Sequence, residues 1–315
     1  MKQAIIVGAG MAGLLAGCIF RDRVAHVYEQ QPSLPNNHSA VLRFRSDGVG
    51  QAIGVDFKAV KVLKGVVAWK NPVADALSYS RKVTGVATAR SILQADEAVV
   101  QRYISPPDLI QKMYAKVHEG NISFATKLSE AAWKSKDEIV ISTIPMPALM
   151  KLLGWQCKSI FRRTAGVNIS ARVADTECYA SLYNPDPRTP WARASITGDR
   201  VIVECYGEAT RLWGKDERWQ EDVLIDAVEE MGLAKEAIAK STITGKQQSY
   251  AKILPIDEDA RKRFILWATE EFSIYSLGRY ATWRPGLLMD DVLQDITVIR
   301  RLIDGGTTYP QRIAI

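Results

Sequence analysis

The chain has 315 residues, a mass of 35.0 kDa and a formal net charge of +6, with 47% hydrophobic and 24% charged residues. This composition excludes a disordered, collagen-like or low-complexity protein, and the length predicts two domains, or one domain with large insertions. Four cysteines without a CxxC pair or a Cys/His cluster argue against a structural metal or disulfides, and predict reduced thiols in the cytoplasm.

The chain begins with an apolar run over residues 3–7, which is typical of a buried parallel strand. A glycine-rich turn over residues 8–13 follows, then a helical pattern to about residue 23 and a second strand over residues 25–28. This order predicts a βαβ opening. Beyond it, no segment reaches the ~20 apolar residues of a membrane span, so no membrane partner is expected.

The middle of the chain predicts shorter elements. Residues 41–46 are strand-like, and residues 55–104 predict short strands and turns. A helix over 106–118 and strands over 122–125 and 138–143 come next, followed by a β-rich pattern over 161–208. The last predicted elements are a helix over 216–239, a strand over 264–268 and a helix over 290–303.

The glycine turn carries the first functional prediction. Gly8 permits a tight turn, Gly10 lets a ligand approach the backbone, and Gly13 lets the helix pack close to the strand. The helix start, with Met11 and Ala12, offers free N–H groups to phosphates. Glu29, 21 residues after Gly8, suits the ribose hydroxyls of an adenosine, and its neighbour Gln30 is counted with the same site. We therefore expect a dinucleotide; Glu29 disfavours NADP but does not separate NAD from FAD.

A resemblance in the C-terminal segment favours FAD over NAD. Residues 276–283 (SLGRYATW) and 288–292 (LMDDV) resemble the closing FAD motif of UDP-galactopyranose mutases and amine-oxidase-like flavoproteins. The resemblance implies that Gly278 and Arg279 contact the FAD pyrophosphate. It also implies that a helix start points at the flavin ring, where its dipole stabilises negative charge; that start comprises Met289, Asp290, Asp291 and Val292.

Residues 43–46 (RFRS) resemble the stretch that runs beside the flavin in this family, with Arg45 where the family has histidine. The resemblance implies that Arg43 and Phe44 contact the cofactor. Arg45 becomes a catalytic candidate, because a cation there stabilises reduced flavin or holds an anionic substrate.

Four further positions follow from the same resemblance. Thr143 ends a strand that closes the FAD site, and Leu128 stands where the family binds adenine through backbone atoms. Arg193 resembles an arginine of the mutases' substrate domain, and Trp283 lies in the closing motif, so both are catalytic candidates. The diphosphate-binding tyrosines of the mutases are missing from residues 282–286, which read TWRPG.

Together these features predict an α/β fold, with a Rossmann-like FAD-binding domain and an inserted β-rich substrate domain. The first comprises residues 1–45, 108–155 and 265–315, and the second comprises residues 46–107 and 156–264. We expect an FAD-dependent oxidoreductase that acts on the C–N bond of an amine. The alternatives are a non-redox sugar-nucleotide mutase and a flavin-binding redox sensor.

The charge pattern bears on the substrate. Residues 151–174 hold five basic and no acidic side chains, which favours an anionic partner such as a nucleotide or DNA. In size and charge the chain resembles compact viral flavoenzymes that modify thymine bases in DNA. The candidate substrates are therefore a small amine and an amino-acid-modified nucleotide, including such a thymine in DNA. The sequence makes no prediction of oligomeric state.

Overall fold

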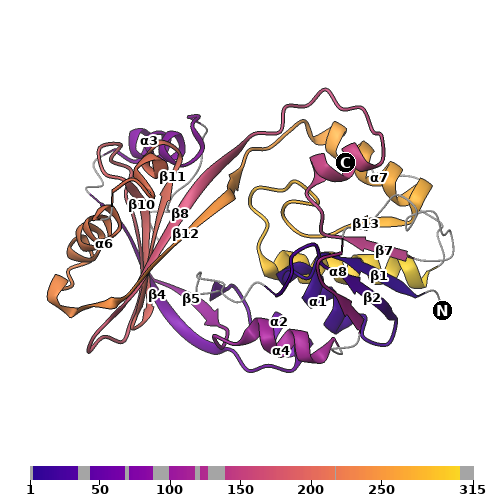
Figure 1. Ribbon diagram of the computed structural model, residues 1–315, viewed down its shortest axis with the longest axis horizontal. Coiled ribbons are helices and arrows are strands. Elements are labelled where there is room, and N and C mark those ends of the chain that lie inside the picture. The colour runs from indigo at the N-terminus through magenta and orange to yellow at the C-terminus, as the bar shows by residue number, and fades with distance from the viewer. Residues whose placement is uncertain are drawn as a thin grey trace.

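The computed structural model describes residues 3–34, 43–67, 71–87, 99–117, 121–126, 139–216 and 218–305, arranged in two units that each contain one sheet (Figure 1). The sheet of the first unit has five strands in the order β13-β7-β1-β2-β6, and all neighbouring strands are parallel. Its strands are β1 (Ala4–Val7), β2 (Val24–Tyr28), β6 (Ile122–Ser123), β7 (Ile139–Ser142) and β13 (Ile274–Ser276).

Helices cover both faces of this sheet, and they bury every side chain of β1 and β7. Ile6 belongs to an apolar core on one face that includes residues of helices α1, α2, α4 and α8, whereas Ile5 and Val7 belong to a core on the other face with residues of α5 and α7. These helices are α1 (Met11–Ile19), α2 (Gly48–Ile53), α4 (Leu109–Lys116), α5 (Met146–Leu152), α7 (Glu258–Phe272) and α8 (Met289–Asp304).

The second unit is built on an eight-stranded sheet in the order β12-β8-β11-β10-β9-β4-β5-β3, antiparallel except for the β4–β9 pair. Its strands are β3 (Arg43–Phe44), β4 (Lys58–Val66), β5 (Val99–Ile104), β8 (Arg163–Val173), β9 (Cys178–Tyr183), β10 (Trp191–Gly198), β11 (Arg200–Tyr206) and β12 (Ile238–Ile253). Two helices, α3 (Pro72–Thr84) and α6 (Trp219–Glu230), and two 3₁₀ turns, Gly207–Leu212 and Lys235–Ala237, complete it.

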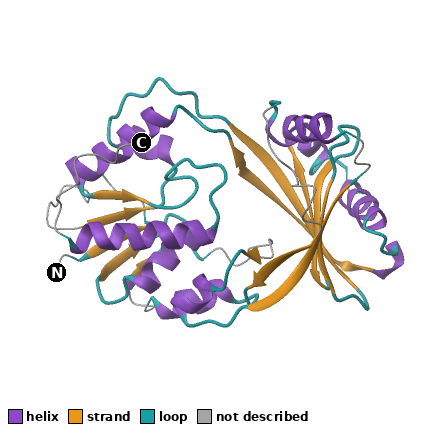
Figure 2. Cartoon of the chain, turned by 180° about the vertical axis from the view of Figure 1, so that it is seen from behind, coloured by secondary structure: helices purple, strands orange, loops and turns teal. Residues whose placement is uncertain are grey.

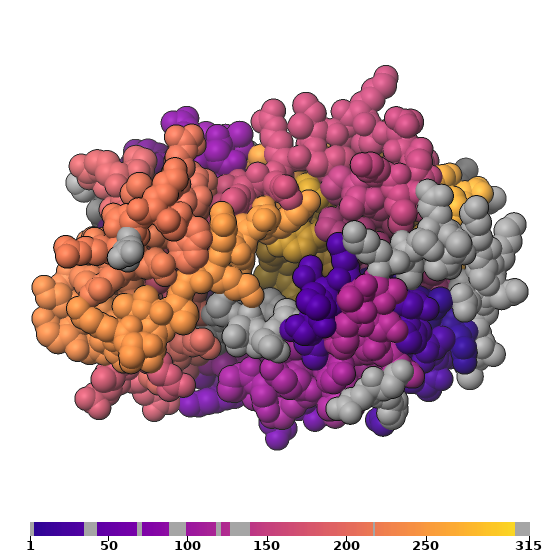
Figure 3. Space-filling view, viewed as in Figure 1, coloured from indigo at the N-terminus to yellow at the C-terminus, as the bar shows by residue number. Residues whose placement is uncertain are grey.

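The two faces of this sheet differ in polarity. Alternate residues of β8 and β11, such as Ile169 and Val203, form an apolar core with α6, which lies on the side away from the first unit (Figures 1 and 2). The opposite face carries Asn168, Arg193 and Glu204, which are cross-strand neighbours. A polar face therefore turns toward the first unit, and a hollow opens between the two, with the yellow C-terminal segment at its floor (Figure 3).

The structure confirms the predicted fold class, an α/β fold with a Rossmann-like parallel sheet and a second, β-rich unit. Two segments pack with the other unit than the one to which the predicted domain boundaries assign them. Helix α2 packs on α1 and α8 of the first unit through Val49 and Ile53, and β3 pairs with β5 in the second sheet.

Three predicted elements are wrong in type or extent. The apolar run over 264–268 belongs to α7, because Asp257 caps that helix and its buried residues, Phe264, Ala268 and Thr269, recur at a helical spacing. Residues 72–84 form α3 instead of strands and turns, because Asn71 accepts two N–H bonds and Pro72 suits the first turn. The helix predicted to residue 239 ends at Glu230, after which β12 begins at Ile238.

No helix among the described residues is both long enough and apolar enough to cross a membrane.

Lys82 of α3 generates a prediction about pH. Its ammonium donates to the carbonyls of Asn184 and Asp186, at 3.1 and 2.6 Å, and to Oγ1 of Thr189 at 2.9 Å, and burial lowers its pKa from 10.5 to about 8. Unfolding therefore takes up a proton between these values, so this group's contribution to stability rises with pH across that window.

We expect the difference in unfolding free energy between wild type and Lys82→Met to change by at most ~1.4 kcal/mol per pH unit between pH ~8 and ~10.5, in favour of the wild type as pH rises. Urea titrations at three pH values measure it. A difference that stays constant across the window would show that the amine is not perturbed.

Candidate functional site

The N-terminus of α1 is the centre of the candidate site. Strand β1 ends at Val7, and Gly10 caps the helix in an extended conformation. Leu14 is the first residue whose N–H bonds within the helix, to the Gly10 carbonyl at 2.9 Å. The preceding N–H groups have no acceptor within the helix, and together with the helix dipole they make this end suited to an anion.

The structure favours glycine at the three positions of the turn for different reasons. Gly8 has a φ of +99°, and a Cβ there would lie 2.1 Å from Oγ1 of Thr143. A Cβ at Gly13 would lie 1.8 Å from the Gly8 carbonyl oxygen. At Gly10, in contrast, a Cβ would meet no atom of the described residues within 4 Å. Two glycines thus shape the turn, and the third leaves open space in front of the helix end.

Glu29 lies against this turn at the end of β2. Its carboxylate accepts the N–H of Ala9 at 2.6 Å and the N–H of Gln31 at 2.8 Å, and the residue is buried. Each carboxylate oxygen has a second lone pair, so the group can still accept hydroxyl donors from a ligand. Gln30, predicted to share this site, is exposed beside it.

The predicted C-terminal motif lies against the same turn. Gly278 has a φ of +92°, and a Cβ there would lie 3.0 Å from Cβ of Ala12. Thr143 donates its hydroxyl to the Val7 carbonyl at 2.8 Å. Arg279 donates through Nε and Nη2 to the Leu287 carbonyl, at 3.2 and 2.9 Å. Segments from the start, middle and end of the chain therefore meet at the glycine turn.

The start of α8 is joined to the segment after β3. Asp290 accepts the N–H groups of Arg45 and Ser46, at 3.2 and 2.9 Å, and the Ser46 hydroxyl at 2.9 Å. Asp291 accepts the Arg45 guanidinium at 2.6 Å. Of the neighbouring residues predicted to share this helix start, Met289 is partly buried and Val292 fully buried in the core of the first unit. The structure thus brings Arg45 to the helix start, as an ion pair.

Arg43 and Phe44 are placed differently from the prediction. Arg43 reaches across the second sheet and donates to Oγ of Ser181 at 2.8 Å and to Oγ1 of Thr197 at 3.0 Å. Burial, together with the nearby Arg193, lowers its pKa to about 10. Phe44 is buried and stacks on Phe57, with ring centroids 4.7 Å apart. Arg43 therefore anchors the segment to the second sheet, because its guanidinium is hydrogen-bonded there. Phe44 is a core residue, because its ring packs against Phe57.

Trp283 is also a packing residue. It is 1% exposed, and its indole N–H donates to the Leu254 carbonyl at 2.8 Å. The ring meets Phe161 edge to face, with centroids 4.9 Å apart. Its polar atom is therefore occupied, which is unlike the catalytic position expected from the sequence.

Arg193 lies on the polar face of the second sheet, with its side chain 34% exposed and paired with Glu204. Glu204 also accepts the Tyr206 hydroxyl at 2.7 Å. Burial opposes ionisation of Glu204, but the charges of Arg193 and Lys252, together with the hydrogen bonds from Arg193 and Tyr206, outweigh it and lower the pKa of the carboxyl to about 2. Arg193 thus lies on the face turned toward the first unit, and its charge is compensated. Leu128 lies outside the described residues.

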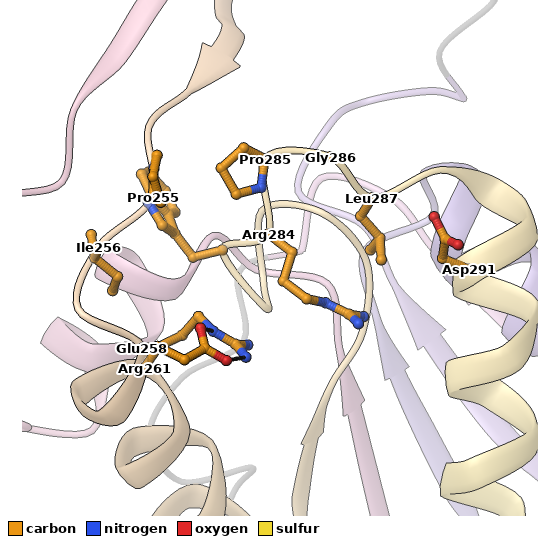
Figure 4. A pocket seen from close by; sticks show the side chains of 10 residues that line it. Pro255, Ile256, Glu258, Arg261, Arg284, Pro285, Gly286, Leu287 and Asp291 are labelled. Carbon is orange, nitrogen blue, oxygen red and sulfur yellow. Dashed lines mark hydrogen bonds and ion pairs between the residues drawn. The ribbon is translucent and has the colours of Figure 1, made fainter. Parts of the chain in front are cut away.

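A cavity of about 290 Å³ lies between the starts of α7 and α8 (Figure 4). Four charged side chains line it: Glu258, Arg261, Arg284 and Asp291. Of these, sequence reasoning identified Asp291 alone, as a flavin contact. The Glu258–Arg261 spacing of three residues on a helix was a usable signal for an ion pair.

Ser276 is a second feature that sequence reasoning missed. It is 8% exposed at the end of β13, two residues before Gly278. Its hydroxyl has no hydrogen-bond partner within the described part of the chain. A buried, unpaired hydroxyl is costly, so this group together with the open space at Gly10 fits a site that a polar ligand completes.

Comparison with solved structures relates the whole chain to one fold class. The chain matches UDP-galactopyranose mutase in its reduced form with a TM-score of 0.68 and 14% identity, over 98% of this chain and 97% of the other. It matches the CLA-producing fatty acid isomerase from P. acnes with a TM-score of 0.59 and 12% identity, over 95% and 98% of the two chains.

A third match is PqsL from Pseudomonas aeruginosa, described as a probable FAD-dependent monooxygenase, with a TM-score of 0.56 and 13% identity over 98% and 88% of the two chains. The chain therefore has the fold that these proteins share. No protein-family model and no curated protein sequence matches it.

The turn geometry predicts the effect of two matched substitutions. Gly13→Ala drives a methyl group into the Gly8 carbonyl and should lower the free energy of unfolding by about 1–3 kcal/mol. Gly10→Ala places the same group in open space and should change it by less than about 1 kcal/mol. Urea unfolding without added ligand measures both, and equal losses would contradict the different roles of the two glycines.

Proposed function

We propose that the protein is an FAD-dependent enzyme that oxidises an amine substrate at a C–N bond. The observation that carries the proposal is the open space at Gly10, bounded by the free end of α1, the Glu29 carboxylate and the Gly278–Ala12 contact. The described FAD dependence of PqsL supports the cofactor, since the two proteins share a fold. The unpaired hydroxyl of Ser276 is consistent with a ligand at the same edge of the sheet.

The residues would hold the dinucleotide by ordinary contacts. The N–H groups at the start of α1, including those of Met11 and Ala12, would bind the pyrophosphate, and Glu29 would accept the adenosine ribose hydroxyls. The Arg279 guanidinium donates through Nε and Nη2 to the Leu287 carbonyl and also interacts with the Tyr280 hydroxyl, and its positive charge would lie beside the phosphates. The Leu287 bond fixes the guanidinium in orientation, which reduces the entropy lost on binding.

A bound flavin supplies the redox chemistry, by accepting a hydride equivalent from the substrate. The chain would orient the substrate and exclude water, using the hollow between the two units and the polar sheet face that carries Arg193. Arg45 would balance the carboxylates at the start of α8, with which it forms an ion pair. It would thereby limit the negative charge near the flavin.

A sugar-nucleotide mutase reaction is the second candidate. The TM-score of 0.68 against UDP-galactopyranose mutase, over nearly the full length of both chains, favours it. The sequence TWRPG at residues 282–286, which lacks the mutase tyrosines, favours the oxidoreductase. A redox sensor is a third alternative. Flavin reduction by amines but not by sugar nucleotides would separate these candidates.

DNA that carries an amino-acid-modified thymine is the proposed macromolecular substrate. The segment 155–162 between α5 and β8 is extended, and its outward side chains include Lys158, Ile160 and Arg162. Arg163, next in sequence, lies 4.1 Å from the ring centroid of Tyr250. An exposed basic segment suits phosphate contacts, and Ile160, 71% exposed, suits contact with the apolar parts of a nucleotide.

The cofactor is tested by the colour of the purified protein. Wild type should release FAD on denaturation, and Gly10→Trp should be colourless because an indole would occupy the pyrophosphate position. Among the described residues a Cβ at residue 10 meets no atom within 4 Å, so the backbone there tolerates a side chain. Circular dichroism checks this. Wild-type protein that binds NAD and no flavin would overturn the proposal.

Measuring DNA binding at several salt concentrations tests the proposed phosphate contacts. Lys158→Ala/Arg162→Ala should reduce the slope of log K against log salt by roughly 0.9 per contact on duplex DNA, or 0.7 on single strands. The control, Arg211→Ala/Lys215→Ala, removes equal charge from another exposed segment and should leave the slope unchanged. Absence of salt-dependent binding by wild type at ~50 mM salt would exclude DNA as the partner.

A further inference from the structure

We propose that the cavity between α7 and α8 binds the zwitterionic end of the substrate, an ammonium and a carboxylate carried on one small group. We call this cavity the α7–α8 pocket; it is defined by Pro255, Glu258, Arg261, Arg284, Leu287 and Asp291. The inference rests on the proposed function in one respect, namely that the ammonium belongs to the amine that is oxidised. It adds the substrate class and the residues that recognise it.

Charges of both signs line the pocket and come from separate segments (Figure 4). Glu258 and Arg261 stand on the first turns of α7, Asp291 stands on α8 on the opposite side, and Arg284 comes from the loop between them. Two arginines face two carboxylates, so the lining has no net charge.

Two of these side chains keep an atom free toward a ligand. Asp291 uses Oδ2 for Arg45 and for the Leu288 N–H, at 2.6 and 2.8 Å, and within the described residues Oδ1 has no partner. Arg284 uses Nε for the Thr282 hydroxyl and Nη2 for Asp295, and Nη1 has no partner in the same described ranges. The pocket thus offers one anionic acceptor and one cationic donor.

The loop that carries Arg284 is held in a strained conformation. Trp283 has a φ of +47°, which is unusual for a bulky side chain. Burial of its ring and the indole bond to the Leu254 carbonyl hold it there. Strain of this kind persists only where packing enforces it, and it is found most often at ligand sites. Packing therefore holds this loop, and with it the backbone of Arg284, in one position.

A zwitterion suits this lining better than a single charge. A carboxylate near Arg284 is repelled by Glu258 and Asp291, and an ammonium near Asp291 is repelled by Arg261 and Arg284. A ligand with both groups pairs with both signs, so each repulsion is offset by an attraction at short range. The two carboxylates also disfavour a phosphate, which carries negative charge alone.

Calorimetry on the flavin-loaded protein tests this with three ligands of one carbon skeleton. L-leucine carries both charges, 3-methylbutylamine carries the ammonium alone, and 4-methylpentanoate carries the carboxylate alone. The other common amino acids extend the panel to different side chains. We expect at least one zwitterion to bind at least tenfold more tightly than its two singly charged analogues. Equal affinities, or no zwitterion binding in the whole panel, would overturn the proposal.

A pair of double variants locates the binding without changing net charge. Glu258→Gln/Arg261→Gln removes both halves of one ion pair in the pocket and should weaken zwitterion binding at least tenfold. The control, Asp259→Asn/Arg263→Gln, removes the same charges from exposed positions on the same helix and should change affinity less than twofold. Equal effects of the two would place the ligand elsewhere.

The readout separates this inference from the proposed function. Calorimetric binding without flavin reduction would keep the pocket and reject amine oxidation. Flavin reduction by amines that lack a carboxylate, as fast as by amino acids, would keep the oxidoreductase and reject the zwitterion pocket. Retained absorbance of bound flavin in the pocket variant would exclude an indirect effect through lost cofactor.

Discussion

The contact between Gly278 and Ala12 is the constraint on which the site depends, because it sets the end of β13 against the start of α1. Any side chain at residue 278 would meet a positive φ as well as the Ala12 methyl group. Through this approach Arg279 and the start of α8 are carried to the glycine turn. The hydrogen bonds of Arg279 to Leu287, and of Asp290 to Ser46, then fix the rest of the site around it.

The short strand β3 and the residue after it connect this site to the second unit. Arg43 bonds to the second sheet, Phe44 enters the core of the first unit, and Arg45 pairs with Asp291 on α8. Arg43 and Phe44 point to opposite faces of the strand, and Arg45 follows after the strand has ended, so three consecutive residues make this link. The distance between the polar sheet face and the start of α8 is thereby restrained at one edge of the hollow.

The parts of the site that are set by local backbone chemistry could be predicted from the sequence. The spacing of Gly8, Gly10 and Gly13 after an apolar run specifies a strand, a turn and a helix start, and Glu29 follows from the length of that unit. The α7–α8 pocket could not be predicted, because Glu258 and Arg284 meet only through tertiary packing. Helix α7 was misread for a related reason: its run Phe264–Ala268 is apolar on all sides, and periodicity alone does not distinguish such a run from a buried strand.

The order of strands in the first sheet has a consequence for how the chain folds during synthesis. Strand β7 lies between β1 and β13, so its neighbours come from the two ends of the described chain. The sheet cannot close before Ser276 has left the ribosome, which at about 5–20 residues per second takes roughly 15–55 s from initiation. Strand β7, which is buried along its whole length, has β1 on one side and stays unpaired on the other until β13 is made, and long-range parallel pairing is slow in itself. Nascent chains of this protein therefore expose the open edge of β7 until β13 has been made.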